Sequence, residues 1–136
     1  VRITCKTCSF TNKVFCLRNT KNCIQENILY QSKLELKFIR WCNINNIVVR
    51  NGPTIDYCFG KDVKKYRVDF EIDSILIEIK DNHIWYSNDL KSGKATAKEN
   101  AVMKLIQDGK YKNFFMITPK KWLYYLETIK KLLNKI

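Results

Sequence analysis

Apolar positions recur at helical intervals in three parts of the chain. The first part spans residues 27–46 and the second spans residues 95–107. The third starts at Thr118, a suitable N-cap that is followed by Pro119 at the first turn. The apolar side of the first expected helix comprises Ile28, Leu29, Leu34, Phe38 and Trp41. That of the last comprises Trp122, Tyr125, Leu126, Ile129 and Leu133, opposite a lysine-rich side.

Between the first two helices, short apolar or alternating runs bounded by turn residues predict strands. These runs are "NIVVR", "TIDYCF", residues 65–72 and "ILIEIK", separated by the turns "NGP" and "GKD" and by a reversal at Asp73–Ser74. Residues 81–94 are expected to form a polar loop, and the continuous apolar run "NFFMIT" predicts a buried central strand. The order of elements predicts an α/β fold in which helices flank one mixed sheet.

The charge balance points to a polyanionic partner. The chain has 25 Lys and Arg against 13 Asp and Glu, a formal net charge of +12. Such a balance favours nucleic acid, although an anionic membrane surface or solubility alone also accounts for it. No apolar run reaches membrane-spanning length and no secretory signal is present, so we expect an intracellular protein of a bacterial or virus-infected cell, without a membrane partner. The chain opens on Val1, which favours a piece of a longer protein.

The cysteines are concentrated near the start of the chain. Four of the six fall in a C-x2-C-x7-C-x6-C pattern, namely Cys5, Cys8, Cys16 and Cys23. A structural zinc ion bound by these thiolates would stabilise so short a segment; a partial site and unliganded or disulfide-linked cysteines are the alternatives. We therefore expect a cysteine-rich unit at 1–25 before a main domain at 26–136. Cys42 and Cys58 lie in apolar surroundings and are expected to be buried.

The reversal at Asp73–Ser74 makes its two flanking strands antiparallel neighbours. Asp69 and Glu78 can then stand nearly opposite each other, and the alternation of a strand puts Lys80 on the same face as Glu78. Two carboxylates so close repel each other unless a hard cation such as Mg²⁺ lies between them. The alternative is a solvated strand face.

Such a metal site would have hydrolytic chemistry. A metal ion held by Asp69 and Glu78 would acidify a bound water, and Lys80 could orient that water or stabilise the transition state. Glu35, on the first expected helix, is predicted to lie at the edge of the apolar face and to need a partner such as this site or Lys80; a surface position is the alternative.

These residues resemble those of the PD-(D/E)xK nucleases. In "VDFEIDSILIEIK", Asp69 matches the aspartate of that motif and Glu78-Ile79-Lys80 matches its E-x-K, while Glu35 in "SKLELKFIRW" resembles the family's helix glutamate. The resemblance covers residues 27–122 and includes the αβββαβ order. Val68 stands where the motif has proline. The segments "NGPTIDY", "LIEIKDNHIW" and "ITPKKW" look like phage- and virus-encoded members, some of them similar to homing or very-short-patch endonucleases.

The resemblance implies a restriction-endonuclease-like core and a Mg²⁺- or Mn²⁺-dependent DNA endonuclease, with Glu35, Asp69, Glu78 and Lys80 as its catalytic residues. Double-strand cleavage would call for a homodimer or sequential nicking. A structure-specific nuclease of the resolvase or repair type is the nearest alternative. A non-catalytic DNA-binding module and a virion or interaction protein are the alternatives from other classes.

Several further residues are weaker candidates. His83 could act on the leaving group, and Lys98 on the second helix could contact a phosphate; an exposed histidine and a solvated helix start are the alternatives. The lysines expected to face DNA are Lys91, Lys94, Lys120 and Lys121. Trp85, Tyr86 and Trp122 could stack on bases or belong to the core.

Overall fold

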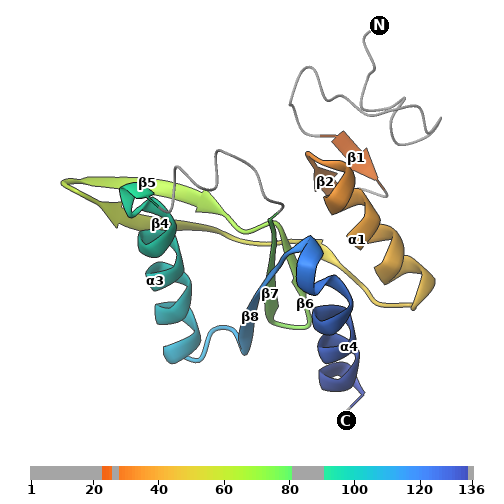
Figure 1. Ribbon diagram of the computed structural model, residues 1–136. Coiled ribbons are helices and arrows are strands. Elements are labelled where there is room, and N and C mark those ends of the chain that lie inside the picture. Colours follow the sequence, from red (N-terminus) through yellow and green to blue (C-terminus); the bar gives the residue numbers. More distant parts are fainter. Residues whose placement is uncertain (1–22, 26–27, 81–90, 135–136) are drawn as a thin grey trace, which may run out of the picture. The chain divides into compact units, whose positions relative to one another are not determined.

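The computed structural model describes residues 23–25, 28–80 and 91–134 (Figure 1). They fall into two compact units with a boundary in the sequence between Asn51 and Gly52. None of the helices in the described residues is long and apolar enough to cross a membrane.

The first unit contains a short hairpin, one helix and a two-residue strand. Its elements are β1 (Cys23–Gln25), β2 (Ile28–Tyr30), α1 (Lys33–Ile44) and β3 (Arg50–Asn51). Strands β1 and β2 are antiparallel. The Asn51 side chain both accepts from the Leu29 amide and donates to the Leu29 carbonyl, each at 2.9 Å. This amide side chain therefore ties the third strand to the second.

The first helix is shorter than its apolar pattern predicted. Ile28 and Leu29 belong to strand β2, so the expectation of a helix from residue 27 is wrong. The helix begins after Ser32, whose hydroxyl accepts a hydrogen bond from the Glu35 amide at 3.1 Å. An N-cap hydrogen bond of this kind fixes the residue at which a helix begins. Here it outweighs the apolar spacing that would include Ile28 and Leu29 in the helix. In "NIVVR" only Arg50 is in a strand.

The second unit holds a separate hairpin, a mixed sheet and two long helices. Its elements are β4 (Thr54–Phe59), β5 (Asp62–Arg67), β6 (Phe70–Ile72), β7 (Ile75–Ile79), α3 (Lys94–Gln107), β8 (Asn113–Ile117), the 3₁₀-helix η2 (Pro119–Lys121) and α4 (Trp122–Leu133). Strands β4 and β5 form an antiparallel pair. Strand β7 pairs antiparallel with β6 and parallel with β8, so the sheet is mixed.

Helices α3 and α4 cover opposite faces of this sheet, as alternate side chains of β8 show. Phe114 packs in an apolar cluster that includes Val102 of α3. The next residue, Phe115, contacts the ring of Tyr125 on α4, with 5.9 Å between ring centroids. Figure 1 shows α3 and α4 on either side of β8. The expected α/β fold with a mixed sheet flanked by helices is therefore confirmed.

Two strand predictions need correction. The strand expected over residues 65–72 divides into β5 and β6, with Val68 and Asp69 between them. At this break Gly52 lies so close that an added Cβ would stand 2.6 Å from the Val68 carbonyl oxygen. The run "NFFMIT" is not central: β8 ends the strand order of the described sheet, and most of its residues are only half-buried.

Candidate active site

The turn after β6 brings Asp69 and Glu78 together. Asp73 and Ser74 both have positive φ, 47° and 67°, which makes the reversal tight. In the resulting register Phe70 stands opposite Ile77, so the next pair outward is Asp69 and Glu78. The Asp69 amide donates to Glu78 Oε1 at 3.2 Å. The predicted juxtaposition of these two residues is therefore confirmed.

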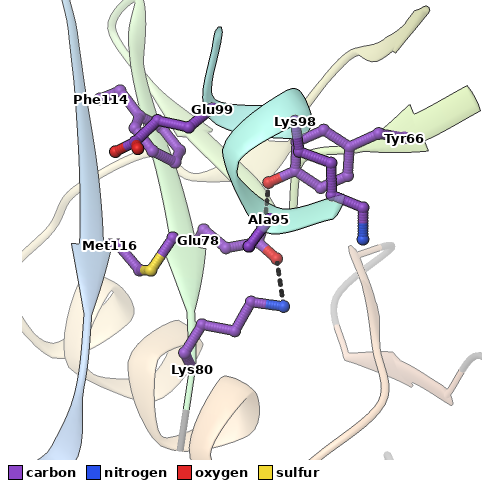
Figure 2. Close-up of a pocket in the computed structure, with 8 residues that line it drawn as sticks. All are labelled: Tyr66, Glu78, Lys80, Ala95, Lys98, Glu99, Phe114 and Met116. Atoms are coloured by element: carbon purple, nitrogen blue, oxygen red, sulfur yellow. Dashed lines mark hydrogen bonds and ion pairs between the residues drawn. The ribbon is translucent and has the colours of Figure 1, made fainter. Parts of the chain in front are cut away.

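Glu78 is buried and fully engaged by donors. Only 4% of the residue is exposed. Its Oε1 accepts from the Tyr66 hydroxyl at 2.6 Å, and its Oε2 lies 3.3 Å from the Lys80 ammonium (Figure 2). A buried carboxylate is tolerated only when such partners replace water. Lys80 thus lies on the same face as Glu78, as strand alternation predicted.

The Asp69 carboxylate is held by the backbone of the neighbouring strand. The Ile79 amide donates to Asp69 Oδ2 at 2.8 Å. Asp69 and Glu78 thus exchange hydrogen bonds with each other's strands, which fixes both carboxylates at one end of the β6–β7 pair. The orientation of both side chains is set by the fold before any ligand is present.

Tyr66, near the end of β5, belongs to this site but was not among the site residues predicted from the sequence. Burial, together with the negative charges of Glu78 and Asp69, raises the pKa of Tyr66 far above its ordinary value, so its hydroxyl remains a donor. A signal existed in the sequence: Tyr66, Val68 and Phe70 alternate with charged residues, and all three are buried. Their alternation continues across the break between the two strands.

Helix α3 adds Lys98 to the same site. Its ammonium lies 5.2 Å from the centre of the Tyr66 ring and 5.9 Å from that of Tyr57, distances typical of cation–π contacts. A small cavity of about 20 Å³ is lined by Tyr66, Glu78, Lys80, Ala95, Lys98, Glu99, Phe114 and Met116 (Figure 2). This volume suits roughly one water molecule. The structure therefore brings Lys98 to the same cavity as Glu78 and Lys80, and its contact with a phosphate stays a prediction.

The donor set fits a hard divalent cation with few protein ligands. Mg²⁺ is often held by one or two carboxylates, and waters or phosphate oxygens complete its shell. Asp69 and Glu78 provide two carboxylates at one end of the β6–β7 pair. Among the residues described here, no group of three or more His, Cys, Asp or Glu side chains is placed to hold a metal. Binding of Mg²⁺ by Asp69 and Glu78 therefore stays a prediction.

Glu35 has a capping role in the first unit. Its Oε1 accepts from the Gln31 amide at 3.0 Å, and its own amide donates to Ser32 Oγ. This arrangement resembles a capping box, in which a glutamate side chain and an N-cap hydroxyl satisfy free amides at the helix start. Because Glu35 belongs to the first unit and Asp69, Glu78 and Lys80 to the second, its catalytic role stays a prediction.

The remaining predicted site residues lie on the surface or outside the described residues. His83 is outside them, as are Cys5, Cys8 and Cys16, and only the backbone of Cys23 is described, so the zinc and His83 predictions stand as predictions. The lysines expected to face DNA are exposed at Lys91, Lys120 and Lys121 and half-buried at Lys94, and their contact with DNA stays a prediction. Trp85 and Tyr86 also fall outside the described residues.

Three core assignments can be compared with the structure. Cys42 is buried as expected, and burial raises the pKa of its thiol from 9.0 to about 12. Cys58 is exposed, so the expectation that it is buried is wrong. On β4 the inward position is the neighbouring Tyr57, which turns Cys58 outward. Trp122 is 8% exposed and belongs to the core, which is the second of its two predicted alternatives.

Comparison of the chain with protein-family models, with curated proteins and with solved structures finds no match.

Proposed function

We propose that the chain is a metal-dependent DNA endonuclease with a PD-(D/E)xK site in a restriction-endonuclease-like core. One observation carries the proposal. Asp69, directly before β6, lies beside Glu78 of the antiparallel strand β7, and the Lys80 ammonium is 3.3 Å from Glu78 Oε2. The three motif residues thus meet in space, on the α3 side of the sheet.

Each residue has a distinct task in this proposal. Mg²⁺ or Mn²⁺, when bound, would supply positive charge for the attacking water and for the developing phosphorane. Asp69 and Glu78 would hold that ion. Tyr66 and the Asp69 amide keep Glu78 Oε1 engaged, which directs Oε2 to the side of Lys80. The Lys80 ammonium would orient the water or stabilise charge in the transition state, and Lys98 would contact a phosphate.

The charge of the chain supports DNA as substrate. With a net charge of +12, the chain attracts a polyanion over long range. Lys120 and Lys121 directly follow the carboxyl end of β8, which is parallel to β7. They therefore lie at the same sheet edge as Lys80. Cutting both strands would need a homodimer or two successive nicks, and a zinc unit formed by Cys5, Cys8, Cys16 and Cys23 would precede the nuclease domain.

A supercoiled-plasmid assay with Mg²⁺ or Mn²⁺ tests the proposal. We expect nicked or linear product from the unchanged chain, and none with EDTA, with Lys80→Ala or with Glu78→Gln. Lys65→Ala and Asp56→Asn are matched controls, because this pair has the same charges but is exposed. The controls should cleave at the normal rate. Cleavage that survives Lys80→Ala and Glu78→Gln would assign the activity to another site or to a contaminant.

One observation favours a non-catalytic DNA-binding module instead. Glu78 is already satisfied by Tyr66, the Asp69 amide and Lys80, so the cluster is stable as a polar network without a metal. Calorimetry with Ca²⁺, a poor substitute in phosphoryl transfer, separates the two functions. Binding of Ca²⁺ that is lost in Glu78→Gln supports the nuclease. DNA binding without any metal binding or cleavage would support the module.

A further inference from the structure

The α4 side of the second unit carries a surface groove that contains none of the proposed catalytic residues, although Lys120 and Lys121 in its lining are among the predicted DNA contacts. Its volume is about 750 Å³, and its lining includes Phe115, Lys120, Lys121, Leu123, Tyr124 and Tyr125. Phe115 points to the opposite face of β8 from Phe114 and Met116, which line the Glu78 cavity. The groove and the candidate active site therefore occupy opposite faces of the same sheet.

Aromatic rings form a continuous row across this groove. Phe115 contacts Tyr125 at 5.9 Å between centroids, and Tyr125 contacts Tyr124 edge-on at 5.3 Å. The inner two rings are half-buried, whereas Tyr124 is 64% exposed. An exposed ring that is held by a neighbouring ring is a suitable platform for stacking.

The exposure of this platform follows from the geometry of α4. The helix covers the sheet with Trp122, Leu126 and Ile129, which are buried and fall at intervals of four and three residues. Leu123 and Tyr124 lie between these positions and turn outward, so Leu123 is 74% exposed. The core does not account for two large apolar side chains that are adjacent and exposed.

The charge beside the rings selects the partner. Lys120 and Lys121 are exposed in η2, at the entrance to α4. The described residues that line the groove include these two lysines and no carboxylate. An apolar protein partner would gain nothing from the lysines, whereas a strand with bases and phosphates uses both features.

We propose that this groove binds single-stranded DNA, with a base stacked on Tyr124 and phosphates paired with Lys120 and Lys121. Duplex DNA does not fit this role, because its base faces are already stacked and closed to a side chain. Binding here is independent of the proposed catalysis. It is measured without metal, so failure of one proposal is distinguishable from failure of the other.

The test is fluorescence anisotropy with the full chain, EDTA, and a labelled oligothymidine of about 12 nucleotides, a length within usual site sizes. Tyr124→Ala should weaken binding roughly 5- to 100-fold, the loss expected for one stacked base. Tyr124→Phe keeps the ring and should bind within about 2-fold of the unchanged chain. An abasic strand of equal length should bind weakly and show no difference between Tyr124→Ala and the unchanged chain.

Lysine variants test the phosphate contacts in the same assay. Replacing both Lys120 and Lys121 with Ala should reduce the slope of log K against log salt by about 1.4, since each single-strand phosphate contact accounts for about 0.7. Lys104→Ala together with Lys110→Ala, exposed lysines outside the groove, removes the same charge and should change that slope less.

Two results would overturn the proposal. The first is unchanged oligothymidine affinity in Tyr124→Ala, checked to be folded by circular dichroism. The second is an equal loss on the abasic strand, which would mean that Tyr124 contacts no base. If sedimentation instead shows a dimer that Tyr124→Ala converts to a monomer while DNA affinity stays constant, the groove joins two copies of this chain.

Discussion

Two lysine–carboxylate pairs in the second unit have the same chemistry and opposite surroundings. Lys65 and Asp56 face each other across the β4–β5 hairpin, 2.9 Å apart, with side chains 74% and 61% exposed. Lys80 and Glu78 are 3.3 Å apart at the end of β7, with side chains 25% and 6% exposed. The pair with the shorter N···O distance lies on the surface, and the pair with the longer distance belongs to the candidate site.

The distance between the two charges is therefore a poor guide to how much each pair contributes to stability. An exposed ion pair contributes about 0–1 kcal/mol, because water solvates both charges almost as well as they solvate each other. A buried carboxylate has lost that water and depends on every donor around it. Glu78 has such donors from β5, from the Asp69 amide and from Lys80. The contrast predicts different outcomes for equivalent substitutions.

The largest expected difference is between Glu78→Ala and Asp56→Ala. Loss of Glu78 leaves the Tyr66 hydroxyl and the Lys80 ammonium without their buried acceptor, so unfolding free energy should fall by about 3 kcal/mol. Asp56→Ala should cost less than about 1 kcal/mol. Urea denaturation measures both, and Glu78→Gln should fall between them because its amide oxygen can still accept from Tyr66. Equal losses of unfolding free energy in Glu78→Ala and Asp56→Ala would contradict the expected difference between the buried and the exposed carboxylate.

A smaller loss is expected from Tyr66→Phe, which removes one hydroxyl and preserves the ring. A buried hydrogen bond to a charged group contributes about 1.5–3 kcal/mol, and we expect a loss in that range. Tyr57→Phe is the matched control, because Tyr57 is also buried and packs edge-on against Tyr66. The loss of unfolding free energy in Tyr57→Phe should be smaller than in Tyr66→Phe. Equal urea midpoints for Tyr66→Phe and Tyr57→Phe would show that the hydrogen bond to Glu78 contributes little to stability.

Alkaline pH should destabilise the buried site. The pKa of Tyr66 is raised above its ordinary value of 10.0 by burial and by Glu78, so the folded chain keeps a proton that the unfolded chain loses. Stability is then fully present below pH 10 and falls above it, by at most about 1.4 kcal/mol per pH unit for one proton.

Cys42 contributes in the same direction from pH 9.0 upward, since its pKa is raised to about 12. Urea midpoints between pH 8 and 11 should therefore decline in the unchanged chain and less steeply in Tyr66→Phe. A decline of equal slope in both chains would show that Tyr66 does not titrate with unfolding.

The smallest effect is the coupling within the exposed pair. A double-mutant cycle of Asp56→Ala and Lys65→Ala should give a coupling of about 0.2–1 kcal/mol, and 1 M salt should reduce it further. A coupling above about 2 kcal/mol would mean that the hairpin surface is far less solvated than its exposure indicates.

The parts of the site that lie close in sequence could be predicted. Asp69 faces Glu78 because the Asp73–Ser74 reversal sets the register of two strands, and a period of two then puts Lys80 beside Glu78. The α3 helix was also evident from its apolar spacing. The last helix, expected from Thr118, begins instead as the 3₁₀-helix η2 at Pro119 and becomes α4 at Trp122, and the Thr118 side chain makes no capping hydrogen bond. Glu35 was recognised as half-buried, but its described contacts are those of a helix cap.

The rest depended on packing between distant segments. Tyr66 and Lys98 reach Glu78 from β5 and α3, and only the folded chain brings these elements together. Cys58 was assigned to the core by local apolarity, yet its exposure depends on which face of β4 the core covers. Local periodicity fixes relative orientation within an element. Which face becomes buried is decided by the surface against which that element packs.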